Sequence, residues 1–196
     1  EKGTRLQRED FTQREEEMFP KLFEDSGMRA SDDQSIIILH AQGFGGTTIV
    51  NHNICFRAPE FVLREWSELG IDEISPKAMA PYYEQVEQEL AVSLIKAEEV
   101  SRNDRLFHKG AERLGLNPQR FLHNRKECIG CGFCYCGCSY ERKQEMAVTY
   151  LPKAEALGVE ILADTEAKVI QRNRDAVTAV IATKHDRASQ RAENIC

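Results

Sequence analysis

The segment GFGGTTIVN, residues 43–51, is the strongest indication of fold in this sequence. Adjacent glycines leave positive φ angles free and let backbone approach a ligand closely, because no Cβ intervenes. The hydroxyls and amides of Thr47 and Thr48 can then donate to a phosphate or to the edge of a flavin ring. A Gly-Gly pair taken alone is more often an ordinary turn, so the surrounding sequence has to decide.

The sequence on both sides of this turn predicts a mixture of strands and helices. A short strand, Ser35 to His40, leads into the glycines, and β-branched residues follow them. Apolar residues at helical spacing, bounded by start and stop signals, predict helices over 59–70, 75–92 and 104–114. Ser75 is the expected N-cap of the second helix. Its buried stripe is predicted to hold Met79, Tyr82 or Tyr83, Val86 and Leu90.

The last part of the chain predicts a helix followed by a strand meander. TYLPKAEALG, residues 149–158, has helical spacing and ends on a glycine, the usual C-terminal stop. Three strands are expected after it, over residues 159–164, 167–173 and 176–183, with a tight turn at NRD between the last two.

Length and composition limit the possible functions. The 196 residues suffice for one domain, or for a domain with an insertion. A net charge of −6 argues against a general nucleic-acid binder, and no apolar run approaches the roughly 20 residues of a membrane span. The opening EKGTRLQRED has neither an initiator Met nor the apolar core of a signal peptide. We therefore expect a fragment of a longer protein, truncated on both sides.

Several motifs, in their order along nearly the whole chain, resemble one family of flavin enzymes. The motifs are GGTT, IVN and CFRAP in the first third, PYYEQVEQEL in the middle and YLPKAEALGVEILADTEAKVI near the end. Together they are similar to the glucose–methanol–choline (GMC) oxidoreductases, and most to the branch with bacterial members and long-chain alcohol oxidases. That branch carries a similar Cys/Gly block. One departure is Cys55, where the family usually has an aromatic residue or Ala.

The resemblance implies an α/β fold: a partial FAD-binding, Rossmann-like domain with a helical, cysteine-rich insertion. Residues 1–56 and 147–196 would be the two parts of the FAD-binding domain, and residues 57–146 the insertion on the substrate side. The G-x-G-x-x-G unit of such a domain should lie about 20 residues before an acidic strand end, and so outside this chain. Glu1, in EKG, resembles that strand end.

The resemblance also implies which residues contact the cofactor, FAD. Glu1 would bond the ribose hydroxyls, Asn51 would lie near the isoalloxazine, and Val169 would approach the adenine through its backbone. The turn would run along the pyrophosphate and flavin with Gly45, Gly46, Thr47 and Thr48. His40 is the nearest candidate for covalent flavin attachment, which some family members have.

The function implied is alcohol oxidation, with a small-molecule alcohol as hydride donor to the flavin. The catalytic His of the family comes from near the C-terminus of the full protein, so we expect no catalytic residue here. The isolated fragment is therefore expected to bind flavin weakly and to be inactive. An electron-acceptor protein is a further expected partner of the intact enzyme.

The block CIGCGFCYCGC, residues 128–138, leaves several alternatives open. The spacing C-x2-C-x2-C-x3-C is that of a bacterial-type iron–sulfur run, with Ser139 where Pro usually follows. A lone cluster would need a remote ligand such as Cys55, or would hold three irons. Four thiolates also suit structural zinc, and a disulfide-pinned or free-thiol loop is the third alternative. The ligands would be Cys128, Cys131, Cys134 and Cys138.

Two further expectations depend on this block. An iron–sulfur cluster would relay electrons from the flavin. The rival function for the whole chain is an iron–sulfur electron carrier or metal-binding module with no catalysis of its own. Cys136 has no role under any of these alternatives. Clustered thiols favour a reducing, cytoplasmic environment.

Overall fold

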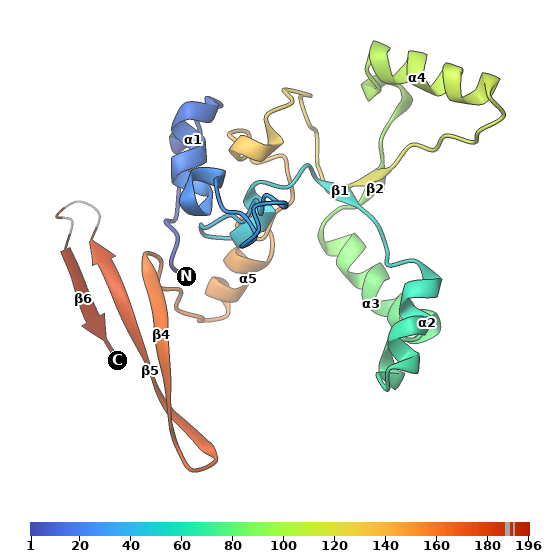
Figure 1. Ribbon diagram of the computed structural model, residues 1–196. Helices are drawn as coiled ribbons and strands as arrows, with labels where there is room; N and C mark the ends of the chain where they lie inside the picture. Colours follow the sequence, from blue (N-terminus) through green and yellow to red (C-terminus); the bar gives the residue numbers. More distant parts are fainter. Residues whose placement is uncertain (187–188, 190) are drawn as a thin grey trace. The chain divides into compact units, whose positions relative to one another are not determined.

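The computed structural model describes residues 1–186, 189 and 191–196, and shows a mixture of helices and sheets (Figure 1). These residues form two compact units. The first unit comprises residues 1–52, 132–141 and 145–196, and the second comprises residues 53–131 and 142–144. The chain therefore leaves the first unit after residue 52, whereas we expected the insertion to begin at 57. The cysteine block is divided between the two units instead of lying inside an insertion.

The core of the first unit is built around the helix α1 (Glu15–Leu22). Three glutamates in its first turn stabilise the helix, because their negative charges lie at the positive end of the helix dipole. Met18 and Leu22 are fully buried on its inner face. The core also contains Phe23, Ala41, Ile49, Val50 and Cys136. Short 3₁₀ turns carry the chain around this core: η1 (Arg8–Asp10), η2 (Glu24–Gly27), η3 (Gly46–Ile49) and η6 (Cys134–Cys136).

The predicted strand from Ser35 to His40 is wrong. The segment forms one side of a loop that has a single bridge, Ala30 to Ile37. Its four consecutive aliphatic side chains, residues 36–39, are exposed. A lone pair of short arms with no third strand beside it is marginal as a sheet, so the β-forming composition of this segment does not produce a strand.

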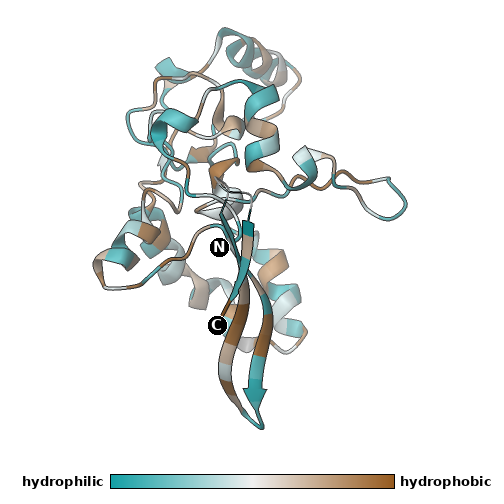
Figure 2. Cartoon of the chain, turned by 90° about the vertical axis from the view of Figure 1, so that its left-hand side faces the viewer, coloured by the Kyte–Doolittle hydropathy of each residue, from teal (hydrophilic) through white to brown (hydrophobic). Residues whose placement is uncertain are grey.

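The C-terminal part of the first unit is an antiparallel meander. The helix α5 (Tyr150–Ala156) precedes it, and the strands β4 (Thr165–Asn173), β5 (Ala176–Asp186) and β6 (Arg191–Ile195) pair in the order β4-β5-β6. Apolar residues colour long stretches of this meander in Figure 2. Residues 159–164 were predicted to form a strand, and they do not. Near their end, the Glu1 amine donates to the Leu162 carbonyl and the Glu1 carbonyl accepts from the Thr165 amide. The strand β6 was not predicted.

The second unit combines a small sheet with three helices. The strands β1 (Ile54–Cys55), β2 (Ser93–Leu94) and β3 (Leu122–His123) pair antiparallel in the order β1-β3-β2. The helices are α2 (Glu60–Glu68), α3 (Pro76–Glu89) and α4 (Arg102–Arg113), with the 3₁₀ turns η4 (Asp72–Ile74) and η5 (Ala97–Glu99). All three predicted helices are confirmed. The Ser75 side chain accepts a hydrogen bond from the Ala78 amide at 3.3 Å, as an N-cap should.

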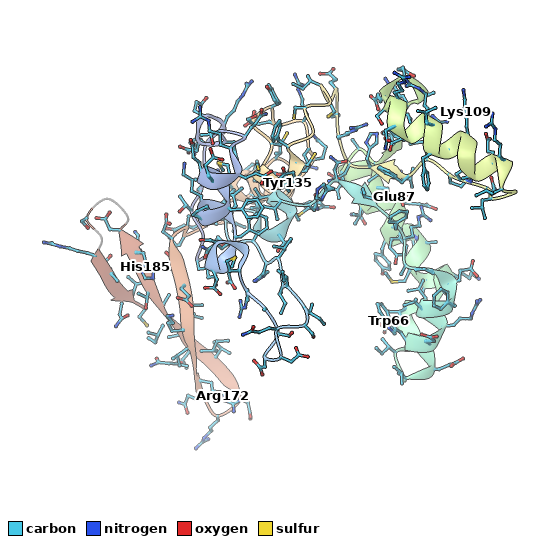
Figure 3. The ribbon with its side chains drawn as sticks, turned by 45° about the horizontal axis from the view of Figure 1, so that its top comes forward. Trp66, Glu87, Lys109, Tyr135, Arg172 and His185 are labelled. Carbon is cyan, nitrogen blue, oxygen red and sulfur yellow. The ribbon has the colours of Figure 1, made fainter. Side chains whose placement is uncertain are left out.

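The predicted buried stripe of α3 is wrong. No residue of α3 is buried in the described structure, and Tyr82 is 61% exposed. In α2 only Leu63 is buried, while Trp66, labelled in Figure 3, is half exposed. The helical spacing is real, but the second unit contains no core large enough to cover both faces.

Every strand pair among the described residues is antiparallel, so these residues include no parallel pair of the kind that forms a Rossmann sheet. Within the same residues, none of the helices combines the length and apolar character needed to cross a membrane.

Candidate cofactor site

The glycine turn in the first unit is held in shape by its own threonine. Gly45 and Gly46 have φ angles of +116° and +58°, a region that L side chains rarely adopt. The Thr48 hydroxyl donates to the Gly45 carbonyl at 2.6 Å and accepts from the Met146 amide at 3.2 Å. Thr48, which we expected to face the cofactor, therefore uses its hydroxyl within the protein.

The free space around each glycine shows which of them touches other parts of the protein and which is open to a ligand. A Cβ on Gly43 would lie 2.7 Å from the Ile49 side chain, and one on Gly45 would lie 3.2 Å from the Ala147 amide. A Cβ on Gly46 would have no heavy atom within 4 Å. A side chain at Gly43 or Gly45 would therefore press on the protein's own atoms. Gly46 presents bare backbone to open space, as a closely approaching ligand needs.

Beside this turn lies a cavity of about 540 Å³, which we call the η3 hollow. Its polar lining includes two of the expected cofactor residues, Thr47 and Asn51. The rest of its lining is mostly apolar and aromatic: Phe19, Phe23, Leu39, Val50 and Tyr135, together with Glu15 and His52. A cavity of this size, apolar with a few polar groups, is typical of a small-molecule or cofactor site.

Tyr135, labelled in Figure 3, connects the aromatic lining of the η3 hollow. Its ring stacks on His52 with the centroids 5.7 Å apart and meets Phe19 edge-on at 6.2 Å. Phe19 in turn lies 4.7 Å from Phe23. Such offset and edge-to-face contacts are the favoured aromatic geometries, so these rings support one another.

The Tyr135 hydroxyl donates to the Glu15 carboxylate at the start of α1. This hydrogen bond is the main reason that the pKa of Tyr135 is raised to about 12, because loss of the proton would set two negative charges side by side. Tyr135 is therefore a neutral donor at physiological pH. Sequence reasoning missed Tyr135, Glu15 and His52, since nothing in their spacing indicates that they meet.

The other expected cofactor residues lie outside the η3 hollow. The Glu1 carboxylate accepts from the Gly3 amide at 2.7 Å, in an exposed position. Val169 lies in β4 and is 54% exposed. His40 is 3.3 Å from the buried Glu24 carboxylate, which is also paired with Lys2 and Arg29. None of the three lines the hollow.

The cysteine block does not form the metal site that its spacing predicts. Cys128 and Cys131 belong to the second unit, and Cys134 and Cys138 to the first. Among the described residues, no three His, Cys, Asp or Glu side chains are grouped so as to hold a metal ion. None of the seven cysteines is in a disulfide, so disulfides do not pin the loop. The arrangement does not fit an iron–sulfur cluster or structural zinc, and leaves the free-thiol alternative.

Cys136, to which the cysteine spacing assigns no role, has a clear structural one. Its side chain is fully buried in the core of the first unit, with Met18 and Leu22. Burial raises the pKa of its thiol, as expected for a cysteine that acts as a small apolar side chain. Cys136 thereby anchors η6 and fixes Tyr135, its neighbour, at the η3 hollow.

The first unit thus has a glycine turn open at Gly46 beside a hollow with aromatic walls, an arrangement that suits a cofactor site. The chain belongs to the GMC oxidoreductase family, whose match covers residues 19–195. The matched region is the FAD-binding, Rossmann-like part of that family.

Relatives of the chain agree with this membership. A long-chain-alcohol oxidase of Arabidopsis thaliana is 32% identical over 78% of this chain and 21% of its own length. An uncharacterized GMC-type oxidoreductase of Sinorhizobium fredii is 30% identical over 78% of this chain and 31% of its own. A cholesterol oxidase of Mycobacterium tuberculosis is 23% identical over 75% and 30%, respectively. The chain thus spans a third or less of the length of these relatives.

Proposed function

We propose that this chain is the flavin-positioning segment of an enzyme that oxidises an alcohol, with FAD as hydride acceptor. The observation that carries the proposal is Gly46, whose backbone faces open space at a positive φ beside the η3 hollow. The names of two relatives, a long-chain-alcohol oxidase and a cholesterol oxidase, support an alcohol as the substrate class. Bound FAD would supply the acceptor for a hydride from the carbinol carbon.

The residues of the first unit fit a flavin in three ways. Gly46 allows close approach of backbone, and the exposed Thr47 side chain next to it can donate a hydrogen bond. Asn51 adds an amide on the same hollow. The aromatic lining offers flat apolar surface to a ring system and excludes water from it. We assign the contact role to Thr47 instead of Thr48, because the Thr48 hydroxyl already bonds Gly45 and Met146.

The Glu15–Tyr135 hydrogen bond gives this proposal its electrostatic part. Because Tyr135 keeps its proton to about pH 12, the hollow is lined by a neutral phenol and not by a phenolate. The Tyr135 ring therefore adds no charge to the hollow, whereas Glu15 in the same lining contributes a carboxylate. Glu1 at the ribose and Val169 near the adenine remain part of the proposal for the FAD of the intact protein.

The experiment is a flavin analysis and anaerobic reduction of the full-length protein. We expect purified protein to release FAD on denaturation, and its oxidised flavin absorbance to bleach when a primary alcohol is added without oxygen. The matching alkane, which has no hydroxyl, should leave the spectrum unchanged. Protein that contains no FAD, or a flavin that no primary or sterol alcohol reduces, would refute the proposal.

A further inference from the structure

The second unit contains a groove that the flavin proposal does not use. It has a volume of about 490 Å³ and lies between α4 and the segments 95–100 and 118–121. We call it the α4 groove. Its size falls within the range of small-molecule sites, and all its lining residues belong to this one unit.

Apolar side chains form the wall of the α4 groove and are accessible to a ligand. The wall contains Ile95, Val100, Phe107 and Phe121. Phe107 is 76% exposed and Phe121 is 39% exposed, although both aromatic rings would gain by burial. A contiguous exposed apolar surface with a polar rim is typical of ligand-binding grooves and interaction sites.

Hydrogen bonds to the backbone hold this groove open. The Arg105 guanidinium, on α4, donates to the Val100 carbonyl, and the Arg120 guanidinium donates to the Ile95 carbonyl at 2.8 Å. The Ile95 amide donates to the Phe121 carbonyl at 3.3 Å and ties the two segments together. The walls are therefore preformed, which spares a ligand the cost of ordering them.

The rim of the groove has a surplus of positive charge. Arg105 and Arg120 bond carbonyls, which leaves their charges uncompensated by an acid. The lining has two acids, Asp104 and Glu112, against three permanent cations, Arg105, Lys109 and Arg120.

Lys109, labelled on α4 in Figure 3, has no hydrogen-bond or ion-pair partner among the residues that the structure describes. An ammonium group at the edge of an apolar wall is complementary to an amphipathic anion. The apolar wall would take a chain, and the ammonium would take the headgroup.

We propose that the α4 groove binds a single-chain aliphatic carboxylate, with the chain against Phe107 and Phe121 and the headgroup at Lys109. The α4 groove lies in the other unit and shares no lining residue with the η3 hollow. An exposed ion pair contributes little, so the apolar wall sets the affinity and Lys109 sets the choice of headgroup.

The test is calorimetric titration of the full-length protein with dodecanoate below its micelle concentration. We expect saturable binding that weakens through decanoate to octanoate, by up to about fourfold for each methylene group lost. Phe107→Ser should weaken binding by about tenfold. Leu106→Ser is the matched control, since Leu106 is exposed on the same helix but does not line the groove, and it should change nothing.

A second experiment tests whether Lys109 binds the headgroup. Lys109→Gln should weaken dodecanoate binding by about fivefold or less and leave dodecanol binding unchanged. Arg113→Gln, on the same helix but outside the lining, is the charge control. Thermal melts and the FAD content of each variant show whether the protein is intact, and separate failure here from failure of the flavin proposal.

Three results would overturn the inference. The first is the absence of saturable dodecanoate binding to folded, FAD-containing protein. The second is an equal effect of Phe107→Ser and Leu106→Ser, which would place the chain elsewhere. The third is dodecanol binding as tightly as dodecanoate, with Lys109→Gln affecting neither.

Discussion

Replacing Gly46 by Val tests the open backbone at the glycine turn. With φ at +58°, an L residue costs about 1–2 kcal/mol of stability through strain with its own carbonyl. No protein atom lies within 4 Å of the added Cβ, so the substitution makes no steric clash there within the protein itself. If FAD occupies this space, the valine side chain should block FAD binding, in addition to the modest loss of stability from strain.

Gly70→Val is the matched control for this experiment. Gly70 has φ at +92° and no heavy atom within 4 Å of a built Cβ, so an L residue there is strained by its backbone and makes no clash. It lies in the second unit, after α2. Both variants should therefore lose unfolding free energy of the apoprotein through backbone strain, and only Gly46→Val should lose the cofactor.

The assay combines flavin content with chemical unfolding in the presence and absence of added FAD. A ligand at a hundredfold excess over its Kd stabilises the native state by about 2.7 kcal/mol. We expect this gain in the unmodified protein and in Gly70→Val, and none in Gly46→Val. A Gly46→Val protein that purifies with a full complement of FAD would show that the turn does not face the cofactor, and the reasoning from Gly46 would fail.

Three further predictions follow from buried and coupled groups. Cys136→Ser should lower the unfolding free energy by about 1–3 kcal/mol, because a hydroxyl replaces a thiol in a fully buried apolar site. Cys196→Ser, the control at an exposed position, should change it by no more than about 0.5 kcal/mol. Equal effects of the two substitutions would contradict the place of Cys136 in the core. Tyr135→Phe should leave the tyrosinate absorbance unchanged in a titration through pH 10, since Tyr135 keeps its proton to about pH 12; a lost titrating group near pH 10 would show that the bond to Glu15 is absent. Burial, with the neighbouring Arg125 charge, lowers the pKa of His123 below its ordinary value of 6.5, so its stabilising contribution is complete above about pH 6.5 and is lost as the pH falls toward the lower folded pKa. His123→Gln should flatten that acid side of the stability curve measured by urea unfolding, and an unchanged curve would exclude His123 as the cause.

The helices show what local sequence chemistry can determine. The α2, α3 and α4 helices lie where spacing and stop residues predict them, with Ser75 as N-cap and Gly70 and Gly115 at positive φ after α2 and α4. A cap or a glycine stop requires only a few neighbouring residues, so it can be recognised in one chain. The prediction of the buried stripe of α3 was wrong, because burial depends on what else packs against the helix.

The sheet and the cysteines show the opposite case. The aliphatic run at residues 36–39 has the composition of a strand but lacks a sheet to join, and residues 159–164 pass the backbone of Glu1 without becoming a strand. The cysteine spacing indicates a metal, yet the chain divides the block between two units. A strand needs a partner from elsewhere in the chain, and a metal site needs its ligands aimed at one point by the surrounding fold, so neither can be read from the segment itself.

The sequence by itself determined that this chain belongs with the GMC oxidoreductases and where its main helices lie. Only the tertiary structure decided that Gly46, and not Gly45, is open, that the Thr48 hydroxyl is occupied within the protein, and that Tyr135 joins Glu15 and His52 at one hollow. The physical reason is that conformational freedom belongs to a residue, whereas free space, burial and pKa belong to its surroundings.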